Sequence, residues 1–151
     1  SDVYKRQTFN MIVGREGRTL RDKWQQEGTK TFLGLHSKGF PNLFIVSGPQ
    51  GGGGSFNFTN AIEEHGDYVV WMLDTLRKAG KDLVDVKAEH EDAYAEHCRA
   101  ADELTRPLRD CITYYNGHGE AEPGSLAYYG GGAWHKYRIR AQESLDPYVF
   151  D

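Results

Sequence analysis

The sequence predicts an α/β protein, and three consecutive stretches carry that prediction. Residues 43–47 (LFIVS) are apolar nearly throughout, as expected of a strand covered on both faces of a parallel sheet. Residues 48–55 follow as a glycine-rich turn, and a long helix is expected from about Asn57 to Ala79. A strand that leads through such a turn to a helix N-terminus is a common way for α/β proteins to hold an anionic cofactor group.

The helix over residues 57–79 has the clearest pattern in the chain. Asn57 or Asn60 can cap its start, Glu63 can complete a capping-box-like pair, and Gly80 can end it. Side chains spaced three and four apart predict one long, mostly apolar stripe: Phe58, Ile62, His65, Val69, Met72 and Leu76.

The four consecutive glycines at 51–54 fit two interpretations. They allow the backbone to approach a ligand closely, and they also fit a flexible turn between a strand and a helix. We favour binding because the helix start can be capped and its entry is aromatic, with Phe56 and Phe58. The turn is neither a GxGxxG fingerprint nor a phosphate loop, so it should not be the primary site for dinucleotide phosphates.

The segments before residue 43 are less regular. Residues 1–7 (SDVYKRQ) carry no periodicity and look like a non-native or adapter-derived tail, so they are excluded from fold reasoning. Residues 8–13 have strand composition, 14–17 have turn chemistry, and 19–26 fit a short helix. We expect residues 8–80 to form one structural segment.

Residues 81–151 are expected to form a second, helical and loop-rich segment. A helix over 85–104 would bury Tyr94, Cys98 and Ala101 and expose the acidic side chains Glu89, Glu91, Asp92 and Glu96. A long aromatic–glycine loop over 114–132 has the length of a lid or binding loop. Its tyrosines (Tyr114, Tyr115, Tyr128 and Tyr129) could line a ligand cleft or simply pack the lid. A short basic helix over 133–144 and an edge strand over 148–150 complete the prediction.

Composition narrows the class of protein. A net charge of −4 with no basic stripe argues against a nucleic-acid partner. No apolar run approaches the roughly 18 residues that a membrane span needs. Two cysteines cannot form a disulfide framework, so we expect a reducing, cytoplasmic location.

Other candidate sites have simpler explanations. His90 and His97 with Glu91 lack the HExxH spacing of a zinc site, so we interpret them as a solvated helix face and predict no metal. Cys98 and Cys111 lack CxxC spacing, and Ser47 and Ser55 lack a nucleophile elbow. We therefore expect neither a thiol nucleophile nor a hydrolase triad.

Three sequence stretches carry a family resemblance: GREGRTLRDKW (14–24), TFLGLHSKGFPNLFIVSGPQ (31–50) and SFNFTNAIEEHGDYVVWML (55–73). Together they resemble the carboxyl-terminal part of flavin-dependent Baeyer–Villiger monooxygenases, and most closely the members that act on large cyclic or steroidal ketones. Near the end, CITYYNG, YYGGG and YRIRAQE resemble closing segments of that family more loosely.

The resemblance implies the carboxyl-terminal part of a FAD- and NAD(P)-binding, Rossmann-like flavoprotein. Such an enzyme uses FAD, NADPH and O2 to convert ketones to esters or lactones. The implied cofactor-binding residues are Gly48, Pro49, Asn57, Phe58 and Thr59. The implied substrate-lining residues are Gly53, Gly54, Ser55 and Phe56, and Tyr114 stands in the mobile loop that closes over NADP.

Several parts of the family pattern are absent from the sequence. It contains no GxGxxG fingerprint, no Baeyer–Villiger signature and no candidate for the catalytic arginine, so we assign no catalytic residue. We expect the missing amino-terminal part of a longer chain to supply them. Two rival functions stay open: another flavin monooxygenase that oxygenates nitrogen or sulfur, and a non-catalytic module that binds a partner.

Overall fold

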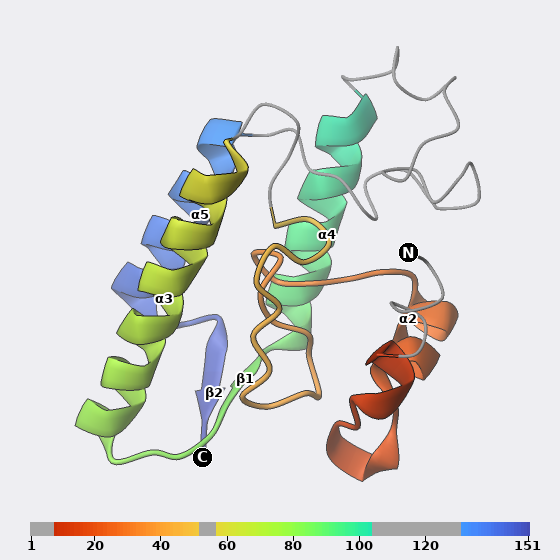
Figure 1. Cartoon of the computed structure of the whole chain (residues 1–151), viewed down its shortest axis with the longest axis horizontal. Coiled ribbons are helices and arrows are strands. Elements are labelled where there is room, and N and C mark those ends of the chain that lie inside the picture. Colours follow the sequence, from red (N-terminus) through yellow and green to blue (C-terminus); the bar gives the residue numbers. More distant parts are fainter. Residues whose placement is uncertain (1–7, 52–56, 104–130) are drawn as a thin grey trace.

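The computed structural model describes residues 8–51, 57–103 and 131–151. Figure 1 shows a helix-rich arrangement around one small sheet. In chain order the elements are a 3-10 helix η1 (Arg15–Gly17), α2 (Leu20–Glu27), α3 (Phe58–Ala79), β1 (Val84–Val86), α4 (Ala88–Glu103), α5 (Gly131–Ser144) and β2 (Tyr148–Phe150). The predicted helices over 19–26, 57–79 and 133–144 are confirmed with small shifts of their ends.

The two strands predicted before residue 48 are wrong. Residues 8–11 are helical, and residues 43–47 run as irregular chain that turns at Ser47, where φ is 55°. The Ile45 amide donates to the Leu35 carbonyl at 2.8 Å, and the Ser47 amide donates to a side chain on α3. A strand needs a paired neighbour along its length, and the described residues place none beside 43–47.

The sheet instead joins β1 to β2. They pair antiparallel, with Val84 opposite Phe150 and Val86 opposite Tyr148. The predicted edge strand at 148–150 is therefore confirmed, and its partner was missed because β1 had been assigned to a helix beginning at residue 85. That helix, α4, begins at Ala88, after a strand whose residues alternate between buried and half-buried.

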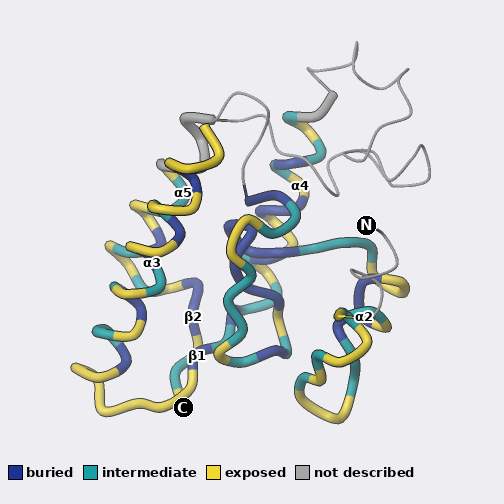
Figure 2. Tube along the Cα trace, viewed as in Figure 1, coloured by how far each residue is buried: buried dark blue, intermediate teal, exposed yellow. Residues whose placement is uncertain are grey.

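One hydrophobic core lies between α3, α4, α5, the sheet and the irregular chain after α2 (Figure 2). Its buried side chains include Leu33, Tyr68, Met72, Tyr94 and Tyr148. Residues from both sides of position 80 therefore pack together. The division of the chain into segments 8–80 and 81–151 stays a prediction.

The face of α3 that enters this core differs from the predicted stripe. His65, Met72 and Leu76 are buried as expected, but Phe58 and Ile62 are 66% and 39% exposed. The observed buried face of α3 consists of Ala61, His65, Tyr68, Met72 and Leu76. In the first two turns Ala61 is buried in place of Phe58 and Ile62, so the local pattern assigned the wrong apolar side chains of these turns to the buried face.

A smaller hydrophobic cluster contains Leu20 and Trp24 of α2 together with Phe40. Beside it, Lys23 Nζ lies 2.7 and 2.6 Å from the two carboxylate oxygens of Glu91, and both side chains are 3% exposed. The prediction that Glu91 belongs to an acidic solvent face is therefore wrong. A lysine 68 positions away in the sequence compensates the buried charge of Glu91. None of the described helices is long and apolar enough to cross a membrane.

Candidate functional site

The start of α3 is capped, exposed and free of acidic side chains in its first turn. Asn57 Oδ1 accepts from the Thr59 amide at 3.1 Å and from the Thr59 hydroxyl. Residues 57–60 are all exposed. Because a helix N-terminus carries unsatisfied N–H groups and a partial positive charge, this end of α3 can face an electron-rich group. At the other end, Gly80 takes the left-handed conformation with φ of 64°, as predicted.

The turn before α3 is built by close contact between glycine backbones. Gly34 has φ of 68°, and a Cβ placed on it would lie 1.9 Å from the Gly51 Cα. A Cβ on Gly48 would lie 2.5 Å from the Gly34 carbonyl oxygen and 2.7 Å from Ile45 Cγ2. Only glycine fits at these two positions, so the chain from 45 to 51 is locked against the segment around residue 34.

Gln50 anchors the same turn from inside. Its side-chain oxygen accepts from the amide and the hydroxyl of Thr31 at 3.0 and 2.9 Å, and its side-chain amide donates to the Thr29 carbonyl at 3.2 Å. Its backbone carbonyl accepts from the Tyr94 hydroxyl at 2.8 Å. Gln50 is 1% exposed, with φ of 64°. Sequence reasoning missed Gln50 and Thr31, because their partnership joins residues 19 positions apart in irregular chain.

His65 links the turn to α3 itself. The Ser47 amide donates to His65 Nδ1 at 3.0 Å, so the neutral ring carries its proton on Nε2. Burial lowers the pKa of His65, while a backbone hydrogen bond involving Gly51 acts in the opposite direction. His65 was predicted only as part of an apolar stripe. In the structure its ring holds the backbone on both sides of Gly48.

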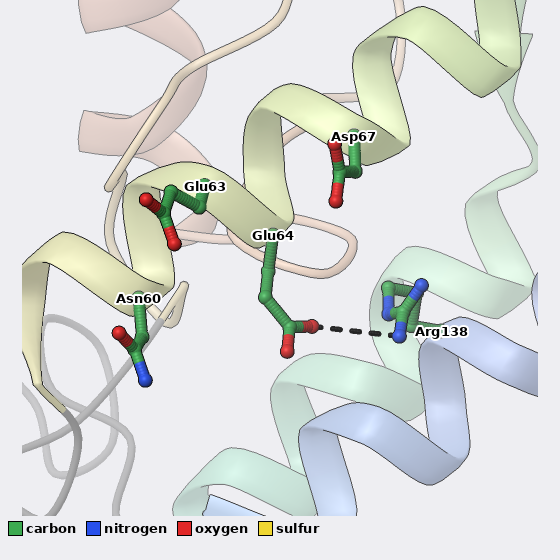
Figure 3. A pocket seen from close by; sticks show the side chains of 5 residues that line it. All are labelled: Asn60, Glu63, Glu64, Asp67 and Arg138. Carbon is green, nitrogen blue, oxygen red and sulfur yellow. Dashed lines mark ion pairs between the residues drawn. The ribbon is translucent and has the colours of Figure 1, made fainter.

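A depression of about 280 Å³ lies between the first turns of α3 and helix α5 (Figure 3). It is lined by Asn60, Glu63, Glu64, Asp67 and Arg138. Arg138 comes from α5, and its Nη2 lies 3.4 Å from Glu64 Oε2. This ion pair links the two helices, and no local pattern signals it, since its members are far apart in the sequence.

The structure places only some of the predicted site residues. Gly48 and Pro49 lie in the locked turn, and Asn57, Phe58 and Thr59 form the exposed start of α3. The predicted substrate-lining residues Gly53, Gly54, Ser55 and Phe56, and the loop residue Tyr114, lie outside the described residues, as do Cys111, Tyr115, Tyr128 and Tyr129. The roles of all ten predicted site residues stay predictions.

The residues considered for other chemistry have structural partners. His90 Nε2 lies 2.9 Å from Asp146 Oδ2, and the His97 ring lies 4.9 Å from that of Tyr137. Burial raises the pKa of the Cys98 thiol to about 12, so it is a poor nucleophile. Across the described parts of the chain, no group of three or more potential metal ligands comes together.

Comparison with known proteins gives a consistent result. No family model matches the chain. A Baeyer–Villiger monooxygenase of Streptomyces coelicolor is 36% identical over 142 residues, which is 89% of this chain and 23% of that protein. The chain also covers 21% of the length of a Baeyer–Villiger monooxygenase from Penicillium patulum. It therefore spans about a fifth to a quarter of the length of the curated relatives it matches.

Solved structures agree with the sequence comparison. A steroid monooxygenase bound to NADP is 28% identical in sequence and superposes with a TM-score of 0.78. The superposition covers 91% of this chain and 26% of the steroid monooxygenase. OTEMO in complex with FAD and NADP is 20% identical, covers 92% of this chain with 26% of its own, and superposes with a TM-score of 0.70, which supports the fold. The predicted resemblance and the predicted fold class are thus confirmed, with the corrections to individual strands given above. The chain belongs to the Baeyer–Villiger monooxygenase family and corresponds to the carboxyl-terminal part of such an enzyme.

Proposed function

We propose that this chain forms one wall of the flavin and ketone site of a monooxygenase that uses FAD, NADPH and O2 to convert ketones to esters or lactones. The observation that carries the proposal is the exposed, capped start of α3, which follows a locked glycine turn in a chain of this family. The neighbour solved with FAD and NADP has the same fold over 92% of the chain. We also propose a cytoplasmic location for the enzyme.

The residues at the start of α3 fit an electron-rich edge of a flavin. The first turn contains no acidic side chain, and the capping residue, Asn57, is neutral. Its capping bond uses the Thr59 amide, so other first-turn amides remain available to a ligand. When bound, the flavin would supply the redox chemistry by which one oxygen atom of O2 is inserted beside the ketone carbonyl, with NADPH as the source of electrons.

The chain's own contribution is to bind and to orient. Gly48 and Pro49 belong to the turn that packs closely against Gly34, where no side chain larger than glycine's fits. A fixed dipole directed at a site where negative charge develops stabilises that charge without reorganisation. We propose that Gly53, Gly54, Ser55 and Phe56 line the ketone side and that Tyr114 belongs to the loop over NADP.

Carboxylates in the second turn of α3 would oppose this effect if they faced the flavin. Glu64 is turned to Arg138 on α5, and Glu63 lines the same depression (Figure 3). Both therefore lie along the side of the helix, where Arg138 offsets part of their charge. We propose that the dinucleotide fingerprints and the catalytic arginine come from the parts of the family's length that this chain does not cover.

The test uses a chimera in which residues 8–151 replace the matching segment of the Streptomyces coelicolor enzyme. In it, Phe58→Asp places a carboxylate at the helix start, and Phe58→Leu removes the ring without adding charge. We expect Phe58→Asp to weaken FAD binding about tenfold, about 1.4 kcal/mol, and to slow ketone turnover, because a charge there opposes the negative group. Phe58→Leu should retain FAD within about twofold.

The measurements are the dissociation constant of FAD, from titration of the apoenzyme, and ester formation from a cyclic ketone. Equal FAD affinity in Phe58→Asp and Phe58→Leu would overturn the placement of flavin at the start of α3. A chimera that binds FAD but oxygenates only amines or sulfides would overturn the proposed reaction.

A further inference from the structure

Helix α3 carries a second apolar surface beside its buried face. Phe58, Ile62, Val70 and Leu73 are 66%, 39%, 67% and 53% exposed. At 3.6 residues per turn these four positions fall within about 120° of the helix circumference and extend for about 22 Å along it. Gly66 lies in the middle of this surface, and a Cβ built on it would meet nothing within 4 Å. We call these five residues the outer stripe.

Charged side chains of the same turns lie to one side of the outer stripe. Glu63, Glu64 and Asp67 line the depression against α5 with Arg138, as Figure 3 shows. The exposed side of α3 from 58 to 73 is therefore divided into an acidic half toward α5 and an apolar half away from it. A helix with apolar residues on two sides is typical of one that is buried on both, and an exposed apolar surface of this length marks an interface.

The size of the outer stripe decides against a second copy of the chain as its occupant. A single helix face about 22 Å long and 10 Å wide buries a few hundred Å² per partner. Stable protein–protein interfaces bury about 800 Å² on each side. A dimer through this stripe alone would be weak.

The share of the family's length that this chain covers points to a different occupant. The steroid monooxygenase keeps the same fold over 91% of this chain, yet that region is 26% of its own length. About three quarters of the neighbour therefore lies outside the region seen here. We propose that the outer stripe is the surface on which the dinucleotide-binding remainder of the monooxygenase packs, so that α3 lies between two parts of the complete enzyme.

This inference rests on the proposed function in one respect: the function identifies the packing partner as the dinucleotide-binding part of a monooxygenase. The stripe's packing and the flavin's placement can fail separately, because they use different ends and sides of α3. Phe58 belongs to both, so the test uses Val70 and Leu73, which lie three and four turns further along the helix.

The experiment compares four substitutions in the full-length chimera described above. Val70→Glu and Leu73→Glu place a charge in the outer stripe. Val149→Glu and Leu83→Glu are matched controls at apolar residues that are 43% and 36% exposed outside α3. We expect each stripe variant to lower Tm by at least about 5 °C and each control by no more than about 2 °C.

The same substitutions are then made in the 151-residue chain alone. There the outer stripe faces solvent, so Val70→Glu and Leu73→Glu should shift Tm no more than the controls do. Equal shifts in the chimera for stripe variants and controls would overturn the proposal. So would a 151-residue chain that is a dimer in sedimentation equilibrium and becomes monomeric on Val70→Glu, since the stripe would then be covered by a second copy.

FAD affinity separates this proposal from the proposed function. If the stripe variants lower Tm in the chimera while Phe58→Asp leaves FAD affinity unchanged, the outer stripe stands and the flavin placement fails. If Phe58→Asp weakens FAD binding while the stripe variants behave as the controls, the flavin placement stands and the packing proposal fails.

Discussion

At the scale of single residues, a buried chain of polar groups runs through the core. His36 Nε2 lies 2.9 Å from the Tyr68 hydroxyl, which is hydrogen bonded to the Tyr148 hydroxyl. The three side chains are 2%, 0% and 4% exposed and come from the irregular chain, α3 and β2. Because buried polar groups are costly without partners, this arrangement specifies how the three segments meet.

Burial also makes the core sensitive to acid. It lowers the pKa of His36 from 6.5 to about 3, so the ring is neutral in the folded chain and becomes protonated in the unfolded chain below pH 6.5. The free energy of unfolding should therefore fall as the pH is lowered from 6.5 to 3, by up to about 1.4 kcal/mol per pH unit from this group.

His36→Phe should remove that contribution and flatten the dependence between pH 6.5 and 4. Urea unfolding at several pH values gives the slope. Tyr148→Phe is the control, because it disturbs the same buried chain of polar groups without removing the His36 imidazole, and it should keep the slope. A His36→Phe variant with the slope of the original chain would contradict this origin of acid sensitivity.

At the scale of elements, the sequence correctly predicted the helices whose ends are marked by capping residues. The bounds of α3 follow from Asn57 and Gly80, and α2 begins beside Thr19, whose hydroxyl accepts from the Asp22 amide at 3.1 Å. The segment 43–47 was misassigned because apolar composition does not distinguish a strand from buried irregular chain. Glu91 was misassigned because its partner, Lys23, is distant in sequence.

The glycine turn gives a prediction at this scale. Gly34→Ala and Gly28→Ala both place alanine at a positive φ, 68° and 79°. Only at Gly34 does the new Cβ meet backbone, at 1.9 Å from the Gly51 Cα. Gly28 has φ of 79° and ψ of 162°, a conformation that is essentially restricted to glycine, so Gly28→Ala should cost about 1–3 kcal/mol, and Gly34→Ala should cost clearly more. Chemical denaturation of both variants measures the difference, and equal costs would show that the turn is not locked.

At the scale of the whole molecule, one buried ion pair joins α2 to α4. Besides Lys23, Glu91 Oε1 accepts from the Ser37 hydroxyl at 3.2 Å and from the Lys38 amide at 2.9 Å. The Lys23 ammonium also donates to Ser37 Oγ at 2.9 Å. A lysine and a glutamate in an amphipathic pattern are usually solvated, so no sequence rule could place this pair inside the protein.

A double-mutant cycle tests the pair. Lys23→Met alone leaves a buried carboxylate without its cation and should lower the free energy of unfolding by about 3–5 kcal/mol. Lys23→Met with Glu91→Gln removes both charges, while the glutamine oxygen still accepts from Lys38, so this variant should regain most of the loss. Additive losses from urea unfolding would show that the two charges are not coupled.

The two hydrophobic clusters each contain an indole, and this allows them to be followed separately. Trp71 borders the main core, 5.4 Å from the Tyr68 ring and 6.4 Å from the Tyr148 ring. Trp24 lies in the cluster on α2, 4.9 Å from the Phe9 ring, and its indole N–H donates to the Lys30 carbonyl at 2.9 Å. The chain has a third tryptophan, Trp134, so it is replaced by phenylalanine first. Replacing either Trp24 or Trp71 as well would then leave the other to report, by its fluorescence, whether the region around α2 comes apart before α3 leaves β2.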